Sequence, residues 1–519
     1  MSFNKLGLVP TILILIFLIK VVNGQFDDPD YYWHLKTGEY IVAHGMLPQA
    51  DIFSYTNLGR PWVLDAWLSE VFIYLVHEWG GELGIKIFVA FTLVACFWFC
   101  YAICAKILAG DKAKALIVAL LYCSVLTGAA PRPQLFTFLF FSLFLYLLLD
   151  FKYFGVTKRL WVIPLVMVLW ANLHGGFFIG LVLVGLFILG EWATYFLAGG
   201  AEPSQRRRLI QLTLTGAAAL LATLANPEFI RYWLYPFQAL SLEANQGTIE
   251  EWRSPDFHQP IFVFWFAIVA SFIAAMIYAP RKPDATELAV PLVFVAAAFL
   301  SRRNIPFAAL AMAPFVAVYM RAGLTDSLSK FVMRFRPVRP GSPTGIRARA
   351  SQPLGKHEYA MNWFLVLLTL LTLILIYPER QKTMAASLNT IIPVKATDFI
   401  LHEGIEGRMF NTYHYGGYLI YRLFPRQLVF LDPRTPVYGD AFINNALAIY
   451  QGSSEWKIRF DRYGIDYVIC ESEAPLRQLL REEGTFHLVF DDGMHSVLLR
   501  DMEKYRPIIQ RYAGKPAHD

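Results

Sequence analysis

Long apolar runs that recur from one end of the chain to the other are the feature that most constrains its fold. A helix needs about 20 consecutive apolar residues to cross the hydrocarbon core of a bilayer. Hydrophobic residues make up 56% of the 519-residue chain and charged residues only 17%, which leaves too little polar surface for a soluble protein of this size. The apolar runs lie at roughly 6–22, 85–108, 113–130, 134–151, 159–174, 176–198, 208–225, 260–279, 285–301, 304–320 and 359–377. The sequence therefore predicts a polytopic α-helical membrane protein with about eleven transmembrane helices.

The distribution of Lys and Arg predicts the orientation of these helices. With the N-terminus in the cytoplasm, the cytoplasmic connections carry twenty basic residues and the opposite loops carry seven. The positive-inside rule favours this arrangement, and an odd number of spans then places the C-terminus outside. We expect a multi-pass protein of the plasma (inner) membrane. The net charge of +6 is modest, and the basic residues are gathered in a few loops. This pattern indicates membrane topology and not a nucleic-acid partner.

Two domains are expected. Residues 1–378 form the transmembrane domain, with external loops at 23–84 and 226–259 and a Pro/Gly/Arg-rich cytoplasmic linker at 321–358. Residues 379–519 change character, because short apolar runs such as "GRMFNTY", "RQLVFLD", "IDYVICE", "FHLVFDD" and "HSVLLRD" alternate with amphipathic segments. This alternation predicts an extracytoplasmic α/β domain with a mostly parallel sheet.

Unusual polar residues gather on the external side, beginning with "FDDPDYYWHLKTGEYIVAHG" (26–45) directly after the first span. A carboxylate at this depth can hold a divalent ion against a lipid phosphate or deprotonate an acceptor hydroxyl. Asp28 and Asp30 are the candidates, and His34 follows one turn later. The alternative is an aromatic belt with acidic residues at the start of an interfacial helix.

Arg302, Arg303 and His174 are further external candidates. Two arginines between short spans run against the positive-inside trend and predict a clamp on a lipid phosphate or pyrophosphate. Pairing with the acidic residues of the external loops explains them equally well. His174, in "WANLHGGFFIG", could contact an acceptor, although a lone His at a membrane interface is more often structural.

The first external loop, with "NLGRPW" after it, resembles that of the oligosaccharyltransferase catalytic subunit. That family belongs to the C-type (GT-C) membrane glycosyltransferases, which include the protein O-mannosyltransferases. By this resemblance, Asp28 (the Asp-Pro form) or Asp30 (the Asp-Tyr-Tyr form) is the catalytic or metal-binding aspartate. The metal would be Mg²⁺ or Mn²⁺. The resemblance does not choose between the two residues.

Two later stretches support the resemblance. "GTIEEW" (247–252) is similar to a short acidic motif in a late external loop of bacterial oligosaccharyltransferases, and implies a functional carboxylate at Glu251. "NTYHYGGYLIY" resembles the region of the acceptor motif Trp-Trp-Asp-Tyr-Gly, of which only Tyr415-Gly416 remains. By this match Tyr415 would contact the acceptor.

The departures from the family are equally informative. Thr412-Tyr413-His414 stands where Trp-Trp-Asp would read a sequon, so transfer to asparagine is doubtful. The loop between the third and fourth spans is only "PRPQ" and lacks the family's Asp-x-Asp, so a metal-independent mechanism is also open.

We expect a glycosyltransferase that moves a sugar from a polyprenyl-(pyro)phosphate donor to an acceptor of the cell envelope, which could be glycan, lipid or protein. No nucleotide cofactor is expected. One alternative is a non-catalytic GT-C-like scaffold or lipid-linked-glycan binder of an envelope assembly machine. A transporter is a weaker alternative, because no internal repeat and no ionisable residue at the bilayer midplane stands out.

Overall fold

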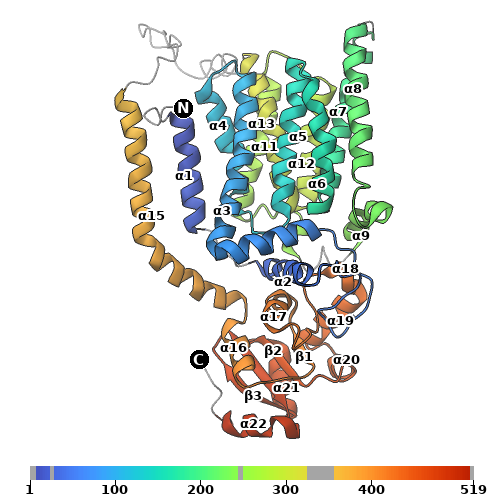
Figure 1. The fold of residues 1–519 in the computed structure, drawn as a ribbon, viewed down its shortest axis with the longest axis vertical. Helices are drawn as coiled ribbons and strands as arrows, with labels where there is room; N and C mark the ends of the chain where they lie inside the picture. Colours follow the sequence, from blue (N-terminus) through green and yellow to red (C-terminus); the bar gives the residue numbers. More distant parts are fainter. Residues whose placement is uncertain are drawn as a thin grey trace.

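The protein is described from a computed structural model that covers residues 7–23, 28–200, 202–242, 249–323, 356–512 and 514. A helix lies over each of the eleven apolar runs (Figure 1). These helices are α1 (Leu8–Asn23), α3 (Trp67–Ile107), α4 (Lys112–Cys123), α5 (Gln134–Phe154), α6 (Val162–Leu173), α7 (Phe177–Leu197), α8 (Pro203–Ala222), α11 (Pro260–Tyr278), α12 (Ala285–Leu300), α13 (Ile305–Arg321) and α15 (Lys356–Ile391). Most of the predicted cytoplasmic linker, residues 324–355, lies outside the described residues.

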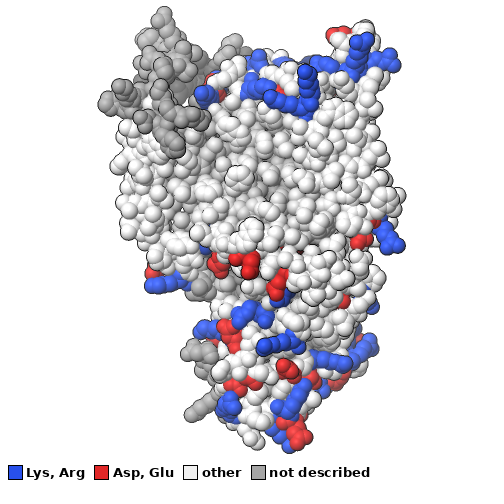
Figure 2. All heavy atoms as spheres, in the orientation of Figure 1, with Lys and Arg blue, Asp and Glu red and all other residues white. Residues whose placement is uncertain are grey.

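Six helices of the described chain are long and apolar enough to cross a membrane: α3, α5, α7, α11, α13 with the turn before it, and most of α15. The helices α1 and α12 are apolar but shorter. On the face that Figure 2 shows, a broad band of the bundle has no charged side chains. Lys and Arg side chains gather at the end of this band that lies away from the C-terminal domain. The protein is therefore a membrane protein.

Charged residues that lie inside the bundle near that far end are paired. Lys152 of α5 contacts Glu191 of α7 and, at 2.7 Å, Asp284 just before α12. Arg281 pairs with Glu287 of α12 at 2.8 Å. Ionisable side chains are costly at this depth unless they are paired, so these contacts hold α5, α7 and α12 together while satisfying each charge.

The helix α2 (Pro29–His44) lies across the opposite end of the bundle and separates it from the C-terminal domain (Figure 1). Asp28 caps it by accepting a hydrogen bond from the Asp30 N–H at 2.9 Å, and Pro29 occupies the first helical position. Tyr31 and Leu35 pack into the bundle core, whereas Trp33 and Ile41 belong to the core of the C-terminal domain. One helix thus joins the two hydrophobic cores.

The second external loop contains α9 (Tyr235–Ser241) and single-turn 3₁₀ segments at Phe229–Trp233 and Glu250–Trp252. A further turn, Arg302–Asn304, connects α12 to α13. Within the predicted first external loop, α3 begins at Trp67 and changes direction at Gly81, where φ is 55°. These turns place polar residues from distant parts of the chain at the domain-facing end of the bundle.

The C-terminal domain is a four-stranded sheet with helices around it, in the order β1-β2-β4-β3. Its elements are α16 (Val394–His402), β1 (Met409–Asn411), α17 (Gly416–Leu423), α18 (Thr435–Tyr438), α19 (Asp440–Tyr450), α20 (Trp456–Asp461), β2 (Tyr467–Glu471), α21 (Pro475–Glu483), β3 (Phe486–Asp491), β4 (His495–Arg500) and α22 (Arg506–Tyr512). Only β1 and β2 run parallel, so the prediction of a mostly parallel sheet is wrong. The reason is the short turn at Gly493 between β3 and β4, because a parallel pair would need a long crossover there.

The run "RQLVFLD" is not a strand of this sheet, contrary to the prediction. Its backbone pairs instead with the first external loop: the Val429 N–H donates to the Phe53 carbonyl at 3.0 Å, and the Tyr55 N–H donates to the Val429 carbonyl at 3.1 Å. The apolar residues of this run are buried, as a strand's would be, so the composition of the run did not reveal its partner. This pairing fixes the loop to the C-terminal domain.

Candidate functional site

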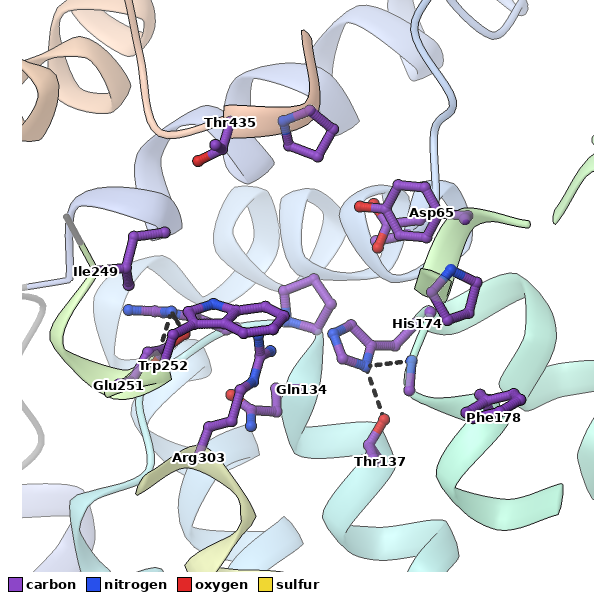
Figure 3. Close-up of a pocket in the computed structure, with 18 of the residues that line it drawn as sticks. Asp65, Gln134, Thr137, His174, Phe178, Ile249, Glu251, Trp252, Arg303 and Thr435 are labelled. Atoms are coloured by element: carbon purple, nitrogen blue, oxygen red, sulfur yellow. Dashed lines mark hydrogen bonds and ion pairs between the residues drawn. The ribbon is translucent and has the colours of Figure 1, made fainter. Parts of the chain in front are cut away.

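A cavity of about 1030 Å³ lies where the domain-facing end of the bundle, the external loops and the C-terminal domain meet. Figure 3 shows Glu251, Trp252 and Arg303 on one side of it and His174, Thr137 and Phe178 on the other, with Thr435 contributed by the C-terminal domain. Its deeper wall is apolar and comes mainly from α7 and α12: Phe178, Ile179, Val182, Val293, Phe294, Ala297 and Leu300. The cavity therefore combines a charged mouth with an apolar wall inside the bundle.

Arg132 joins three carboxylates at the mouth of the cavity. Its Nε donates to Asp28 Oδ2, and its Nη1 lies 3.0 Å from Asp30 Oδ2 and 3.3 Å from Glu251 Oε1. Asp28 is buried, while Asp30, Glu251 and Arg132 are partly exposed and line the cavity. The structure thus brings the three predicted carboxylates together, although Glu251 is far from Asp28 and Asp30 in the sequence.

The local sequence explains why Arg132 faces the acidic cluster. It lies in the four-residue turn "PRPQ", where Pro133 is the cap residue of α5 and Gln134 the first residue of that helix. On the other side, Asp28 is held by its capping bond at the start of α2. Two helix ends therefore present the guanidinium and the carboxylates to each other.

Burial and Arg132 act in opposite directions on the acidic side chains. Burial raises the pKa of Asp30 to about 7, although Arg132 partly offsets this rise. Burial also raises the pKa of Asp28 above its usual value. For Glu251, burial is outweighed by Arg132 and Arg303, and its pKa lies below the usual value. Burial likewise raises the pKa of Asp65, another residue of the cavity wall, to about 6. Asp30 and Asp65 are therefore the carboxyl groups of the cavity that change their charge near neutral pH.

His174 is held as a neutral hydrogen-bond donor. The Gly176 N–H donates to its Nδ1 at 3.0 Å, and Thr137, which accepts from Trp170 Nε1, donates its hydroxyl proton to the same atom at 2.8 Å. With Nδ1 accepting, the ring proton must lie on Nε2. Burial, with smaller contributions from Arg303 and Arg132, lowers the pKa of His174 to about 3.

The second predicted histidine, His34, also lines the cavity, and its Nδ1 lies 2.9 Å from Glu70 Oε1. Gly38 allows this contact, because a Cβ there would lie 2.1 Å from the Glu70 carbonyl oxygen. The close approach of α2 and α3 thus depends on a glycine one turn after His34. Burial, helped by the nearby Arg132 and His174, lowers the pKa of His34 well below its usual value.

Arg302 and Arg303 lie in different surroundings. Arg303 lines the cavity, with its guanidinium 4.5 Å from the ring centre of Trp252. Arg302 is not part of the cavity wall; its guanidinium lies over Phe262 and 3.6 Å from Glu250. Of the two predicted arginines, only Arg303 lines the cavity, together with Arg132. The predicted phosphate clamp stays a prediction.

Tyr415 lies apart from the cavity. It is buried in the C-terminal domain, where its hydroxyl and His495 Nδ1 are 2.6 Å apart. Its predicted contact with an acceptor stays a prediction. The domain contributes Pro433–Val437 to the cavity instead.

Sequence reasoning missed Arg434, which also lines the cavity. This arginine is almost fully buried, pairs with Asp51 at 2.6 Å and Asp432 at 2.7 Å, and lies 4.4 Å from the ring centre of Trp62. It joins the first external loop to the C-terminal domain. The polar run "DPRTP" directly after an apolar stretch was the one indication in the sequence that Arg434 is unusual. That run does not indicate that Arg434 pairs with Asp51, 383 residues away.

A divalent metal at this site would need the carboxylate oxygens of the acidic cluster as ligands. Among the residues that the structure describes, no group of three His, Cys, Asp or Glu side chains is arranged to hold one. Each carboxylate of the cluster faces Arg132 instead. As they lie, these residues do not fit Mg²⁺ or Mn²⁺, which need several oxygen ligands around one point.

No protein-family model and no curated protein matches the sequence. Solved structures do match. The oligosaccharyltransferase of Archaeoglobus fulgidus in its apo form has a TM-score of 0.55 at 12% identity, covering 89% of this chain and 69% of that one. The same enzyme tethered to an acceptor peptide with an NVT sequon has a TM-score of 0.53 at 13% identity, covering 95% and 74%. ArnT from Cupriavidus metallidurans bound to undecaprenyl phosphate has a TM-score of 0.49 at 13% identity, covering 95% and 97%.

The matches to the oligosaccharyltransferase confirm the predicted resemblance at the level of the fold. The chain has the fold of the C-type (GT-C) membrane glycosyltransferases. At this level of identity, the comparison defines the class of the fold and not the substrates.

Proposed function

We propose that this protein is a GT-C glycosyltransferase that moves a sugar from a polyprenyl-(pyro)phosphate donor to an acceptor of the cell envelope. The observation that carries the proposal is the cavity itself. Asp30, Glu251, Arg132 and Arg303 converge at its mouth, and an apolar wall leads from them into the bundle. A lipid-linked phosphate sugar has the same division between an anionic head and an apolar tail.

The proposal includes the topology that the sequence predicts: eleven spans, a cytoplasmic N-terminus, and residues 379–519 outside the plasma (inner) membrane. The Lys and Arg side chains that gather at the end of the bundle away from the C-terminal domain support this topology, because Lys and Arg favour the cytoplasmic side (Figure 2). The cavity would then open at the outer face, where a lipid-linked donor can reach it by diffusing within the membrane.

Arg132 and Arg303 would hold the donor phosphate. Guanidinium groups bind phosphate oxygens by charge-assisted hydrogen bonds, and stacking on Trp252 keeps Arg303 in place. The lipid tail would lie along the apolar wall of α7 and α12, where Val293 and Leu300 are exposed on the surface of the bundle.

Asp30 would act as the general base. Its carboxylate takes the proton from an acceptor hydroxyl, the acceptor oxygen forms a bond to the anomeric carbon, and the bond from that carbon to the phosphate oxygen breaks. The polyprenyl phosphate leaves with the bonding electron pair, stabilised by the two arginines. A base with a pKa of about 7 suits this step, because it is ionised yet still basic near neutral pH. The His174 Nε2–H would hold a hydroxyl of the sugar or the acceptor.

The acceptor would lie between the bundle and Pro433–Val437. The acceptor could be a glycan, a lipid or a protein. Tyr415, the remnant of the peptide-acceptor motif, is buried elsewhere and does not line this cavity. The predicted Mg²⁺ or Mn²⁺ at Asp28 and Asp30 stays a prediction, and no step above depends on it.

The test is donor turnover by the full-length protein in lipid nanodiscs, offered a panel of polyprenyl-phosphate and -pyrophosphate sugars. We expect sugar release from one donor class that Asp30→Asn reduces by about 10²- to 10⁴-fold. Glu250→Gln is the matched control, because Glu250 is exposed and lies outside the cavity. Release that survives Asp30→Asn would refute the assigned base.

A non-catalytic scaffold or glycan-binding protein is the second candidate. It is favoured by one observation: all three carboxylates of the cluster are already engaged by Arg132. It predicts that lipid-linked glycans bind without turnover, and that Asp30→Asn leaves this binding intact.

A further inference from the structure

The carboxylates of Asp28, Asp30 and Glu251 are grouped around a single atom pair of Arg132, its Nε and Nη1. Each of their six oxygens lies within 3.4 Å of a nitrogen. The two oxygens that do not face Arg132 accept from the Asp30 N–H and from Trp33 Nε1. Each oxygen of the cluster therefore already has a hydrogen-bond or ion-pair contact without any added cation.

A divalent ion in this cluster would have to bind the same oxygens. Mg²⁺ and Mn²⁺ require oxygen ligands at short range around one centre, and that centre is where the guanidinium lies. The ion would also stand beside a fixed positive charge on a side chain that is held between two helix ends, in a largely buried place. Geometry and charge thus both oppose an ion while Arg132 is present.

We propose that Arg132 is the resident cation of this cluster: its guanidinium takes the place and the charge-balancing role of a divalent metal, and wild-type protein binds no Mg²⁺ or Mn²⁺ there. Arg132 and Arg303 line the same cavity, and both act electrostatically on Glu251. The permanently charged guanidinium of Arg132 can therefore bind the anionic head of a ligand directly, in the role that a metal ion would otherwise have. The inference concerns the cluster alone and does not depend on which donor, if any, is turned over.

The experiment measures Mn²⁺ binding directly. Full-length protein in nanodiscs of zwitterionic lipid is freed of metal with chelator, and Mn²⁺ alone is titrated in while the signal of free Mn²⁺ is followed by electron paramagnetic resonance. The variants are Arg132→Met and the double variant that adds Asp30→Asn. Arg302→Met is the matched control, because it removes the same charge outside the cavity.

We expect wild type and Arg302→Met to bind no more Mn²⁺ than the double variant, and Arg132→Met to gain about one equivalent that Asp30→Asn removes again. Bound Mn²⁺ in wild-type protein that is lost in Asp28→Asn or Asp30→Asn would overturn the proposal, whatever the Met variants show. If Arg132→Met fails to fold, the comparison of wild type with Asp28→Asn and Asp30→Asn still decides it. Neither result requires sugar transfer, so failure here is distinct from failure of the proposed function.

Discussion

At the scale of single residues, Asp28 and Asp30 lie two positions apart and contact the same guanidinium, yet they occupy different environments. Asp28 caps α2 and is buried, while Asp30 lines the cavity. The sequence could not choose between them because both fit the family's motif. Only Asp30 of the two lines the cavity, and for this reason we propose Asp30 as the base and give Asp28 a positioning role.

The pH dependence of turnover should report Asp30, whose pKa lies above that of Asp65, the other cavity carboxyl group with a pKa raised toward neutrality. Burial raises its pKa to about 7, so the base is protonated and inactive below that pH and ionised above it. We expect initial rates to rise with pH and level off near pH 8, with a rate at pH 6 about tenfold below the plateau. His34 and His174 stay neutral over this range because their pKa values are lowered. A flat profile from pH 5.5 to 8 would contradict the assignment of the base.

Arg303 should contribute to donor affinity. Replacing Arg303 with Met removes a charge-assisted contact to phosphate worth roughly 1.5–3 kcal/mol, which corresponds to about a 10- to 100-fold higher KM for the donor. Arg302→Met removes an equal charge from outside the cavity, and we expect a clearly smaller effect. Equal losses in the two variants would mean that the arginines act through the general potential of the surface and not through a bound phosphate.

At the scale of elements, the turn between α6 and α7 shows how tightly the site is packed. A Cβ on Gly176 would lie 2.4 Å from Thr137 Oγ1 and 2.7 Å from His174 Nδ1. Gly176→Ala should therefore displace His174 and destabilise the protein by about 1–3 kcal/mol, measured as a lower thermal unfolding midpoint together with reduced turnover. Gly185→Ala in α7 is the control, because a Cβ at that position would have no neighbouring atom within 4 Å. Equal behaviour of the two variants would show that His174 is not held as described.

The sequence predicted the helices well but not the partners of the strands. Every apolar run became a helix, because hydrophobic length is a local property. The β3–β4 hairpin and the pairing of Val429 with the first external loop were missed, since strand partners depend on distant residues. Arg132 is an intermediate case: the sequence suggested that it could join the site with Arg302 and Arg303, but one arginine in a four-residue turn could not indicate its three acidic partners.

At the scale of the whole molecule, the cavity exists because three separate units are fixed together. The bundle supplies its floor, α2 joins the two hydrophobic cores, and Arg434 ties the first external loop to the C-terminal domain through Asp51 and Asp432. A Cβ on Gly417 would lie 2.1 Å from the Pro29 carbonyl oxygen, so α17 rests directly on the start of α2. The position of Asp30 therefore depends on contacts with the C-terminal domain as well as with the bundle.

The central claim is that this cavity receives a lipid-linked phosphate. The most direct measurement is a cryo-electron microscopy structure of the full-length protein in nanodiscs that contain a polyprenyl phosphate. The account predicts density for the phosphate between Arg132 and Arg303, with the tail along α7 and α12. Lipid density confined to the outer surface of the bundle, with the cavity filled by a protein segment or by solvent alone, would contradict it.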